Sequence, residues 1–203
     1  MIIALDGPAA AGKGTLAKAL AAHFGLPHLD TGALYRAVAA KVLREGCAPQ
    51  IAAATLDASD MAAPDLRSGA VGAQASVVAA IPAVRASLLE FQRNFARQPG
   101  GAVLDGRDVG TVVCPWPEVV KFFVTASPAA RAQRRFKELL ALGETPIYER
   151  VFADLEARDR RDSERADAPM KQAPDAALID TSDLDASAVL QAALARIAAK
   201  TRF

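Results

Sequence analysis

Five short apolar segments, separated by longer helical patterns, constrain the fold of this chain most. They cover residues 2–5, 27–30, 101–105, 119–124 and 176–180, and each is predicted to form a buried strand. Apolar residues spaced four apart predict a helix over residues 15–24, and further helices are expected through Tyr35 toward Leu43 and over residues 187–199. Strands that alternate with helices in this way predict an α/β fold, a five-stranded parallel sheet with helices on both faces.

Four of the predicted strands end in an aspartate: Asp6, Asp30, Asp105 and Asp180. Ligands of open α/β sheets bind outside the carboxyl ends of the strands, so these acids are well placed for chemistry. An aspartate at this position can also simply begin a turn or cap the next helix. We prefer that simpler interpretation for Asp180 and a functional role for Asp105, which lies in the sequence DGRD.

The stretch GPAAAGKGT, residues 7–15, follows the first strand and opens the first helix. Glycines let the backbone approach a phosphate chain, and N–H groups at a helix N-terminus attract it. This context indicates a nucleoside triphosphate loop, while an accidental Gly-Ala-rich turn is the alternative. Gly14 follows Lys13 where the usual pattern has Ser or Thr, so the hydroxyl near Mg²⁺ would come from Thr15. The predicted ATP-binding residues of the loop are Gly7, Pro8, Ala9, Ala10, Ala11, Gly12, Lys13, Gly14 and Thr15.

Composition limits the classes of protein that the chain can belong to. Its 203 residues, 52% of them hydrophobic, suit one globular domain, residues 1–203, with a small insertion. The formal net charge of +1 does not suggest a nucleic-acid or acidic-membrane partner. Cys47 and Cys114 lack metal-ligand spacing and fit a reducing compartment, and no export signal or membrane span is evident, so we expect a cytoplasmic location.

Two segments interrupt the alternation of strands and helices. Residues 47–72 contain Pro49, Pro64 and Gly69 and no convincing strand, which indicates a small insertion. Residues 142–165 are charged and rich in arginine, with Gly143 and Pro146 near the start of the segment as candidate hinge points.

Arginines cluster at the exits of the predicted strands. Arg36 lies one helical turn after the second strand and Arg107 directly follows the third, where ligands bind. Arginine suits phosphate because its planar fork binds bidentately and stays charged. For Arg135, Arg160 and Arg161 a solvated helix face is the simpler interpretation, since Glu156–Arg160 and Arg158–Asp162 are spaced as i,i+4 ion pairs.

Five motifs together resemble those of bacterial cytidylate kinases, a branch of the nucleoside monophosphate kinases with a P-loop NTPase-type fold. The motifs are GPAAAGKGT, LDTGALYRA, LDGRDVGTVV, TASPAARAQRRFKEL and RDRRDSERADAP, in this order over nearly the whole chain. The resemblance implies transfer of the γ-phosphoryl group of MgATP to CMP or dCMP, with Mg²⁺ as the cofactor. We expect a monomer, as for small single-domain kinases of this kind. The resemblance makes residues 142–165 a lid and residues 47–72 the acceptor-side insertion. This insertion is shorter here than in that family, which leaves the preference between CMP and dCMP open.

The resemblance also implies roles for individual residues. Arg131 and Arg134 would belong to the ATP side and the lid, and Thr15 would contact Mg²⁺ through ATP. Thr31, Arg36, Arg107 and Arg165 would bind the acceptor phosphate, and Asp105 would belong to the same site. The cytosine would contact Ser76, Arg85 and Asp108, and the sugar Arg158 and Asp162. Lys13, Arg107, Arg134 and Arg165 would be the catalytic cations.

Simpler interpretations of two base-site residues stay open from the sequence. A serine in a helix rich in Ala and Val, such as Ser76, often bonds its own backbone. Arg85, nine residues on, fits an exposed helix position equally well.

Two other functions compete with this interpretation. A different small-molecule kinase would share the loop and differ in its acceptor. A nucleotide-dependent switch would hold or hydrolyse its nucleotide and use a partner surface, but the arginines at the strand exits favour a second anionic substrate.

Overall fold

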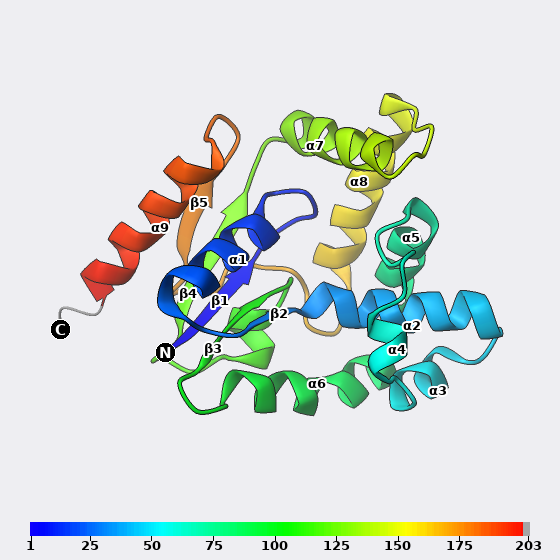
Figure 1. Cartoon of the computed structure of the whole chain (residues 1–203), viewed down its shortest axis with the longest axis horizontal. Helices are drawn as coiled ribbons and strands as arrows, with labels where there is room; N and C mark the ends of the chain where they lie inside the picture. Colours follow the sequence, from blue (N-terminus) through cyan, green and yellow to red (C-terminus); the bar gives the residue numbers. More distant parts are fainter. Residues whose placement is uncertain (201–203) are drawn as a thin grey trace.

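A computed structural model describes residues 1–200, so the last three residues of the expected 1–203 domain lie outside the described residues. The strands are β1 (Ile2–Asp6), β2 (His28–Asp30), β3 (Ala102–Asp105), β4 (Val120–Thr125) and β5 (Ala177–Asp180). They form one parallel sheet in the order β2-β3-β1-β4-β5 (Figure 1). The predicted strands are therefore confirmed to within one residue at each end.

Helices cover both faces of the sheet, as predicted. On one face, α1 (Lys13–Phe24) and α9 (Ala186–Lys200) pack on the side chains of Ile3, Leu5 and Phe122. On the other face, α2 (Thr31–Glu45) and α6 (Pro82–Ala96) pack on Ala4 and Leu104. Because successive side chains of a strand point to opposite faces, these fully apolar strands can contact both helical layers. The observed architecture is the P-loop NTPase-type α/β fold.

Residues 47–72 are folded as helices α3 (Pro49–Ala54) and α4 (Ala58–Met61) and the start of α5 (Gly69–Val78), with no strand in this range. The buried carboxylate of Asp60 in α4 accepts hydrogen bonds from Lys41, at 2.8 Å, and Arg44, at 2.6 Å, of α2. These two charge-assisted bonds fasten the short segment to the sheet-covering helix.

The remaining elements surround the carboxyl ends of the strands. The π-helix η1 (Val109–Val113) follows β3, while α7 (Pro128–Ala141) and α8 (Tyr148–Glu164) follow β4. Figure 1 shows α7 and α8 beyond the carboxyl end of β1, with α5 beside α8. Leu139 of α7 and Leu155 of α8 form a separate apolar cluster that includes Ala9, which lies between β1 and α1.

In the part of the chain that the structure describes, no single helix has the length and apolar composition needed to cross a membrane. The pair α5 and α6 reaches those limits only when counted together across a 97° bend.

Gly7→Ala is expected to be far more damaging than Gly46→Ala. Gly7 has a φ of 139°, and a Cβ there would collide with the backbone carbonyl oxygen of Val124 in β4. Gly46 has a φ of 66° with open space around it. In urea unfolding followed by circular dichroism, Gly46→Ala should lower the free energy of unfolding by about 1 kcal/mol, and Gly7→Ala by more than about 3 kcal/mol. Similar losses in the two variants would contradict the close packing of the loop on β4.

Candidate functional site

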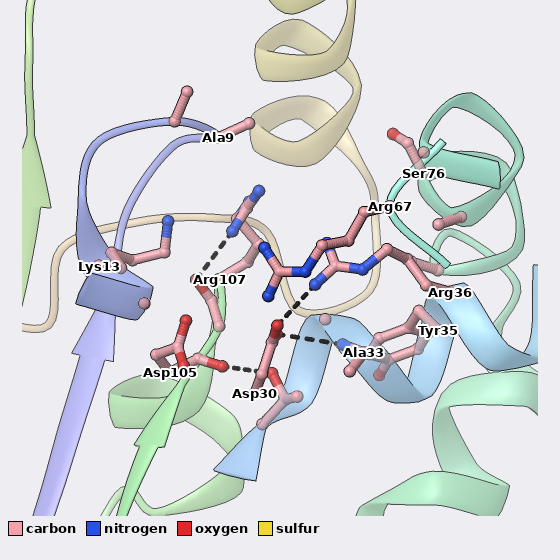
Figure 2. A pocket seen from close by; sticks show the side chains of 18 of the residues that line it. Ala9, Lys13, Asp30, Ala33, Tyr35, Arg36, Arg67, Ser76, Asp105 and Arg107 are labelled. Atoms are coloured by element: carbon pink, nitrogen blue, oxygen red, sulfur yellow. Dashed lines mark hydrogen bonds and ion pairs between the residues drawn. The ribbon is translucent and has the colours of Figure 1, made fainter. Parts of the chain in front are cut away.

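A cleft of about 830 Å³ opens at the carboxyl ends of β1, β2 and β3. It is lined by residues 9–15 and by side chains of α2, α5, α7, α8 and the turn after β3 (Figure 2). Among the described residues its charged lining is strongly cationic. The cations are Lys13, Lys18, Arg36, Arg67, Arg85, Arg107, Arg134, Arg135, Arg158 and Arg165, and the acids are Asp30, Asp105, Asp108, Glu138 and Asp162. Such a lining suits highly anionic ligands.

Lys13 is the first residue of α1 and lies at the base of the loop. Gly12 before it has a φ of 88°, which lets the chain turn into the helix. The amine of Lys13 donates to the carbonyl oxygen of Pro8 at 2.7 Å, and the side chain is 5% exposed. Burial, and then the nearby Arg107, hold the pKa of this amine well below its usual value. The amine has no carboxylate within ion-pair distance among the described residues, and an anion beside it would favour its protonated form.

Two contacts from outside the loop hold its backbone, and Arg134 fixes the residue that makes one of them. Thr181, after β5, donates its hydroxyl to the carbonyl oxygen of Ala11 at 3.0 Å. Arg134 of α7 donates to the Thr181 hydroxyl at 2.9 Å and to its carbonyl at 2.6 Å. Arg131 donates to the carbonyl of Ala9 at 3.3 Å. Arg134 lines the cleft, whereas Arg131 is buried outside the lining and pairs with Asp159 at 2.7 Å.

Two carboxylates at the ends of β2 and β3 organise the next part of the cleft. Asp30 caps α2 by accepting from the Ala33 amide at 3.1 Å, and it also accepts from Arg36 at 2.6 Å. Thr31 donates its hydroxyl to the carbonyl of Asp105 at 2.8 Å. The sequence analysis predicted Thr31, Arg36 and Asp105 at this site, and all three line the cleft. The two neighbouring strands meet here in register, with Asp30 opposite Asp105.

His28 and Thr181 were not predicted to contribute. His28 contacts the Asp105 carboxylate through Nε2 at 2.7 Å and lines the cleft. His28 precedes Asp30 by two residues, so alternation along the strand could have placed both on one face. Thr181 follows Asp180 at a strand exit, which was the available signal for it.

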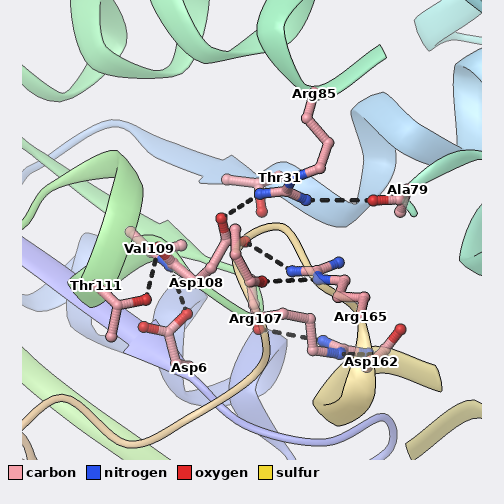
Figure 3. A network of polar contacts seen from close by, with 12 residues as sticks. Asp6, Thr31, Ala79, Arg85, Arg107, Asp108, Val109, Thr111, Asp162 and Arg165 are labelled. Atoms are coloured by element: carbon pink, nitrogen blue, oxygen red, sulfur yellow. Dashed lines mark hydrogen bonds and ion pairs between the residues drawn. The ribbon is translucent and has the colours of Figure 1, made fainter. Parts of the chain in front are cut away.

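Arg85 and Asp108 form a buried ion pair, with 7% and 5% of their surfaces exposed (Figure 3). Arg85 also donates from Nε to Asp167 at 3.1 Å and from a terminal nitrogen to the Tyr35 hydroxyl at 3.3 Å. Arg165 approaches the other oxygen of Asp108 at 3.4 Å. The exposed position considered for Arg85 is therefore wrong, because the fold places this face of α6 against α2 and the turn after β3.

The carboxylate of Asp162 in α8 interacts with side chains from several elements. It accepts from Arg107 Nε at 3.0 Å and from the Ser76 hydroxyl at 3.3 Å. Burial favours a higher pKa for Asp162, but Arg107, Arg158 and Arg165 outweigh burial and hold the pKa below its usual value. The Ser76 hydroxyl therefore donates to a residue of another helix. The hydrogen bond to its own backbone, which was the simpler interpretation, is not the one observed.

Arg158 lies beside Asp162, at 3.8 Å from Nε to the carboxylate. Burial, and then the neighbouring Arg107, lower the pKa of Arg158 to about 10. Its buried Nε has no hydrogen-bond partner among the described residues. An unpaired buried donor is costly, and this one lies in the lining of the cleft.

Arg135 pairs with Glu138 of its own helix at 2.8 Å, and it also lines the cleft and donates to the carbonyl of Arg67 at 3.3 Å. Arg160 is exposed and Arg161 is half-buried. Arg67 and Lys18 also line the cleft, and nothing in their sequence context had singled them out.

Comparison with known proteins gives a consistent family signal. The family model described as "Cytidylate kinase" matches residues 3–199. A cytidylate kinase of Xanthobacter autotrophicus is 57% identical over 98% of each chain. One of Cereibacter sphaeroides is 57% identical over 96% of this chain and 94% of its own. An uncharacterised protein from Eubacterium ventriosum shares the fold, with a TM-score of 0.57 at 15% identity over 100% of this chain and 99% of its own.

We expect ATP to raise the pKa of Lys13, because phosphate oxygens replace the buried environment that lowers it. Calorimetry over a series of pH values, in buffers of different ionisation enthalpy, should therefore detect proton uptake when ATP binds, at pH values between the pKa of the free amine and that of the bound amine. Lys13→Arg carries a permanent charge and should bind ATP with less uptake. Equal uptake in the two proteins would show that other groups bind the proton.

Proposed function

Since this chain belongs to the cytidylate kinase family and transfers the γ-phosphoryl group of ATP to CMP or dCMP, we propose how its cleft binds the two nucleotides. Donor and acceptor bind at opposite ends of one cationic cleft, and the protein acts by positioning them and stabilising charge.

The donor phosphates bind the loop of residues 7–15, with Lys13 as the main cation on the β- and γ-phosphates. Arg134, fixed on Thr181, faces the same end of the cleft and supplies a second cation. Arg131 acts on the ATP side by holding the Ala9 carbonyl, because its buried side chain supports the loop. The backbone amides of the loop and the start of α1 supply the remaining donors.

The acceptor phosphate binds Thr31, Arg36, Arg107 and Arg165, with Asp105 holding Thr31 in place through its carbonyl. Arg36 and Arg107 are each paired with one carboxylate, so each retains further N–H donors for phosphate. The sugar binds Asp162 and Arg158, whose unpaired Nε supports this role.

The observation that carries the acceptor assignment is the buried pair of Arg85 and Asp108 at the end of the cleft near Ser76. Cytosine offers an amino donor beside the N3 and O2 acceptors. Asp108 and Ser76 would accept from the amine, and Arg85 would donate to the two acceptors. Uracil presents a carbonyl where cytosine has its amine, so it would leave buried polar groups unpaired.

The transferred group develops charge that Lys13, Arg107, Arg134 and Arg165 stabilise. An oxygen of the acceptor phosphate attacks the γ-phosphorus directly, so no protein nucleophile is needed. Closing the lid over both substrates keeps water from reacting in place of CMP.

The residues present are compatible with Mg²⁺ that arrives with ATP. The Thr15 hydroxyl is exposed at the loop, and the Asp105 carboxylate lies 3.9 Å from where a Cβ of Gly14 would be. Hydroxyl and carboxylate oxygens suit Mg²⁺, and no cluster of three or more His, Cys, Asp or Glu in the described residues could hold a metal alone. Mg²⁺ would supply charge neutralisation on the phosphates, with Thr15 and Asp105 on its protein side.

The proposal also covers the organisation of the chain. One domain, residues 1–203, would include the short insertion of residues 47–72 and the lid of residues 142–165. Glu144 supports contact between these parts, because it accepts from the Gly69 amide at 3.0 Å. A cytoplasmic monomer would suffice, since one chain supplies the whole described lining of the cleft.

A panel of nucleoside monophosphates tests the acceptor. With MgATP in a coupled ADP assay, CMP and dCMP should be phosphorylated at least about tenfold more efficiently than UMP, AMP or GMP. Faster turnover of another nucleotide would overturn the cytosine site. Slow ATP hydrolysis that no acceptor accelerates would support the nucleotide-dependent switch instead.

Arg85→Ala should raise KM for CMP by about 10- to 100-fold and change KM for ATP little, because it removes charged donors to the base. Arg97→Ala is the matched control, since Arg97 ends the same helix and lies over the Trp116 ring, 4.1 Å from its centre. It should leave both KM values unchanged. Equal increases for CMP and ATP in Arg85→Ala would place Arg85 outside the base site.

A further inference from the structure

Asp6, the last residue of β1, carries a carboxylate that the proposed chemistry does not use. Its side chain is 4% exposed and accepts two backbone hydrogen bonds, from the amides of Val109 and Gly110, each at 2.7 Å (Figure 3). The next residue, Gly7, begins the donor loop. Asp6 therefore connects the strand before the donor loop to the turn that carries Arg107 and Asp108.

The two amides are the first two of η1, and Asp108 stands directly before them. An aspartate directly before a helix commonly caps it by accepting from the second or third amide, here that of Gly110 or Thr111. Asp108 makes no such side-chain bond here, and Asp6 accepts from the Gly110 amide instead. The Asp108 carboxylate is thus left to face Arg85 and Arg165.

Burying a carboxylate is costly, and this cost raises the pKa of Asp6 to about 7 although the two amides act in the opposite direction. The donor loop does not depend on this group alone. Lys13 on Pro8, Thr181 on Ala11 and Arg131 on Ala9 hold the loop through other contacts. Loss of the Asp6 contacts should therefore act mainly on the turn after β3.

We propose that Asp6 is a positioning residue for recognition of the acceptor, which acts by binding the amides of Val109 and Gly110 so that Asp108 faces the base and Arg107 the acceptor phosphate. This inference rests on the proposed function of Asp108 in the base site.

Asp6→Asn tests the proposal with almost no change in shape. The side-chain amide of the asparagine keeps one acceptor oxygen, but it turns an NH₂ group toward one of the two backbone N–H groups. We expect KM for CMP to rise about tenfold, discrimination of CMP against UMP to fall by a similar factor, and KM for ATP to stay within about twofold. Asp185→Asn is the matched control, because Asp185 also accepts from a backbone amide, that of Ala188 at 2.8 Å, on an exposed turn. It should change none of these values.

Gly110→Ala tests the same contact from its other side and serves if Asp6→Asn does not fold. A Cβ there would lie 3.2 Å from both an Asp6 oxygen and the Cδ of Lys121, so we expect the Asp6 oxygen to shift by a few tenths of an ångström, with the same selective effect on CMP. The effects of the two substitutions should not add, because both act on one contact.

Equal increases in KM for CMP and ATP, or a lower melting temperature with unchanged discrimination, would overturn the positioning role. If the unmodified protein itself failed to prefer CMP over UMP, the base site would be wrong, which is a different failure. If the unmodified protein prefers CMP over UMP and both variants keep this preference, the role of Asp6 is refuted and the base site is not.

Discussion

The carboxylate of Asp162 is the interaction on which the arrangement of the cleft depends. It joins α8 to Ser76 of α5 and to Arg107 of the turn after β3. Without it, the nearby guanidinium groups of Arg107 and Arg158 would repel each other in a buried setting. Asp162 therefore holds α8 against the cleft and fixes the position of the Arg107 guanidinium.

The same principle extends through the rest of the cleft. Asp30 holds Arg36, and Asp108 holds Arg85 and Arg165. Each pair fixes an arginine before a nucleotide arrives, so less freedom is lost on binding. In phosphoryl transfer the protein contributes mainly positioning and electrostatic stabilisation. A cleft of arginines held by carboxylates supplies both.

Much of this structure could be predicted from local patterns. The five strands follow from short apolar runs, and the loop follows from the glycines around Lys13. Arg36 and Arg107 were predicted at the cleft because parallel strands place their carboxyl ends at one edge. The burial of Arg85 could not be derived this way, since its position in a helix fits an exposed or a buried face equally well. His28 and Thr181 were missed because their partners, Asp105 and Ala11, lie far from them in the chain.

The sequence by itself determined where strands and helices follow one another along the chain, the phosphate loop and the family motifs. Each of these depends on residues that are close together in sequence. Only the tertiary structure decided which carboxylate holds which arginine, and that Asp6 rather than Asp108 binds the first amides of η1. The physical reason is that an ion pair depends on distance in space and on burial. Neither is set by sequence spacing when the partners come from different strands and helices.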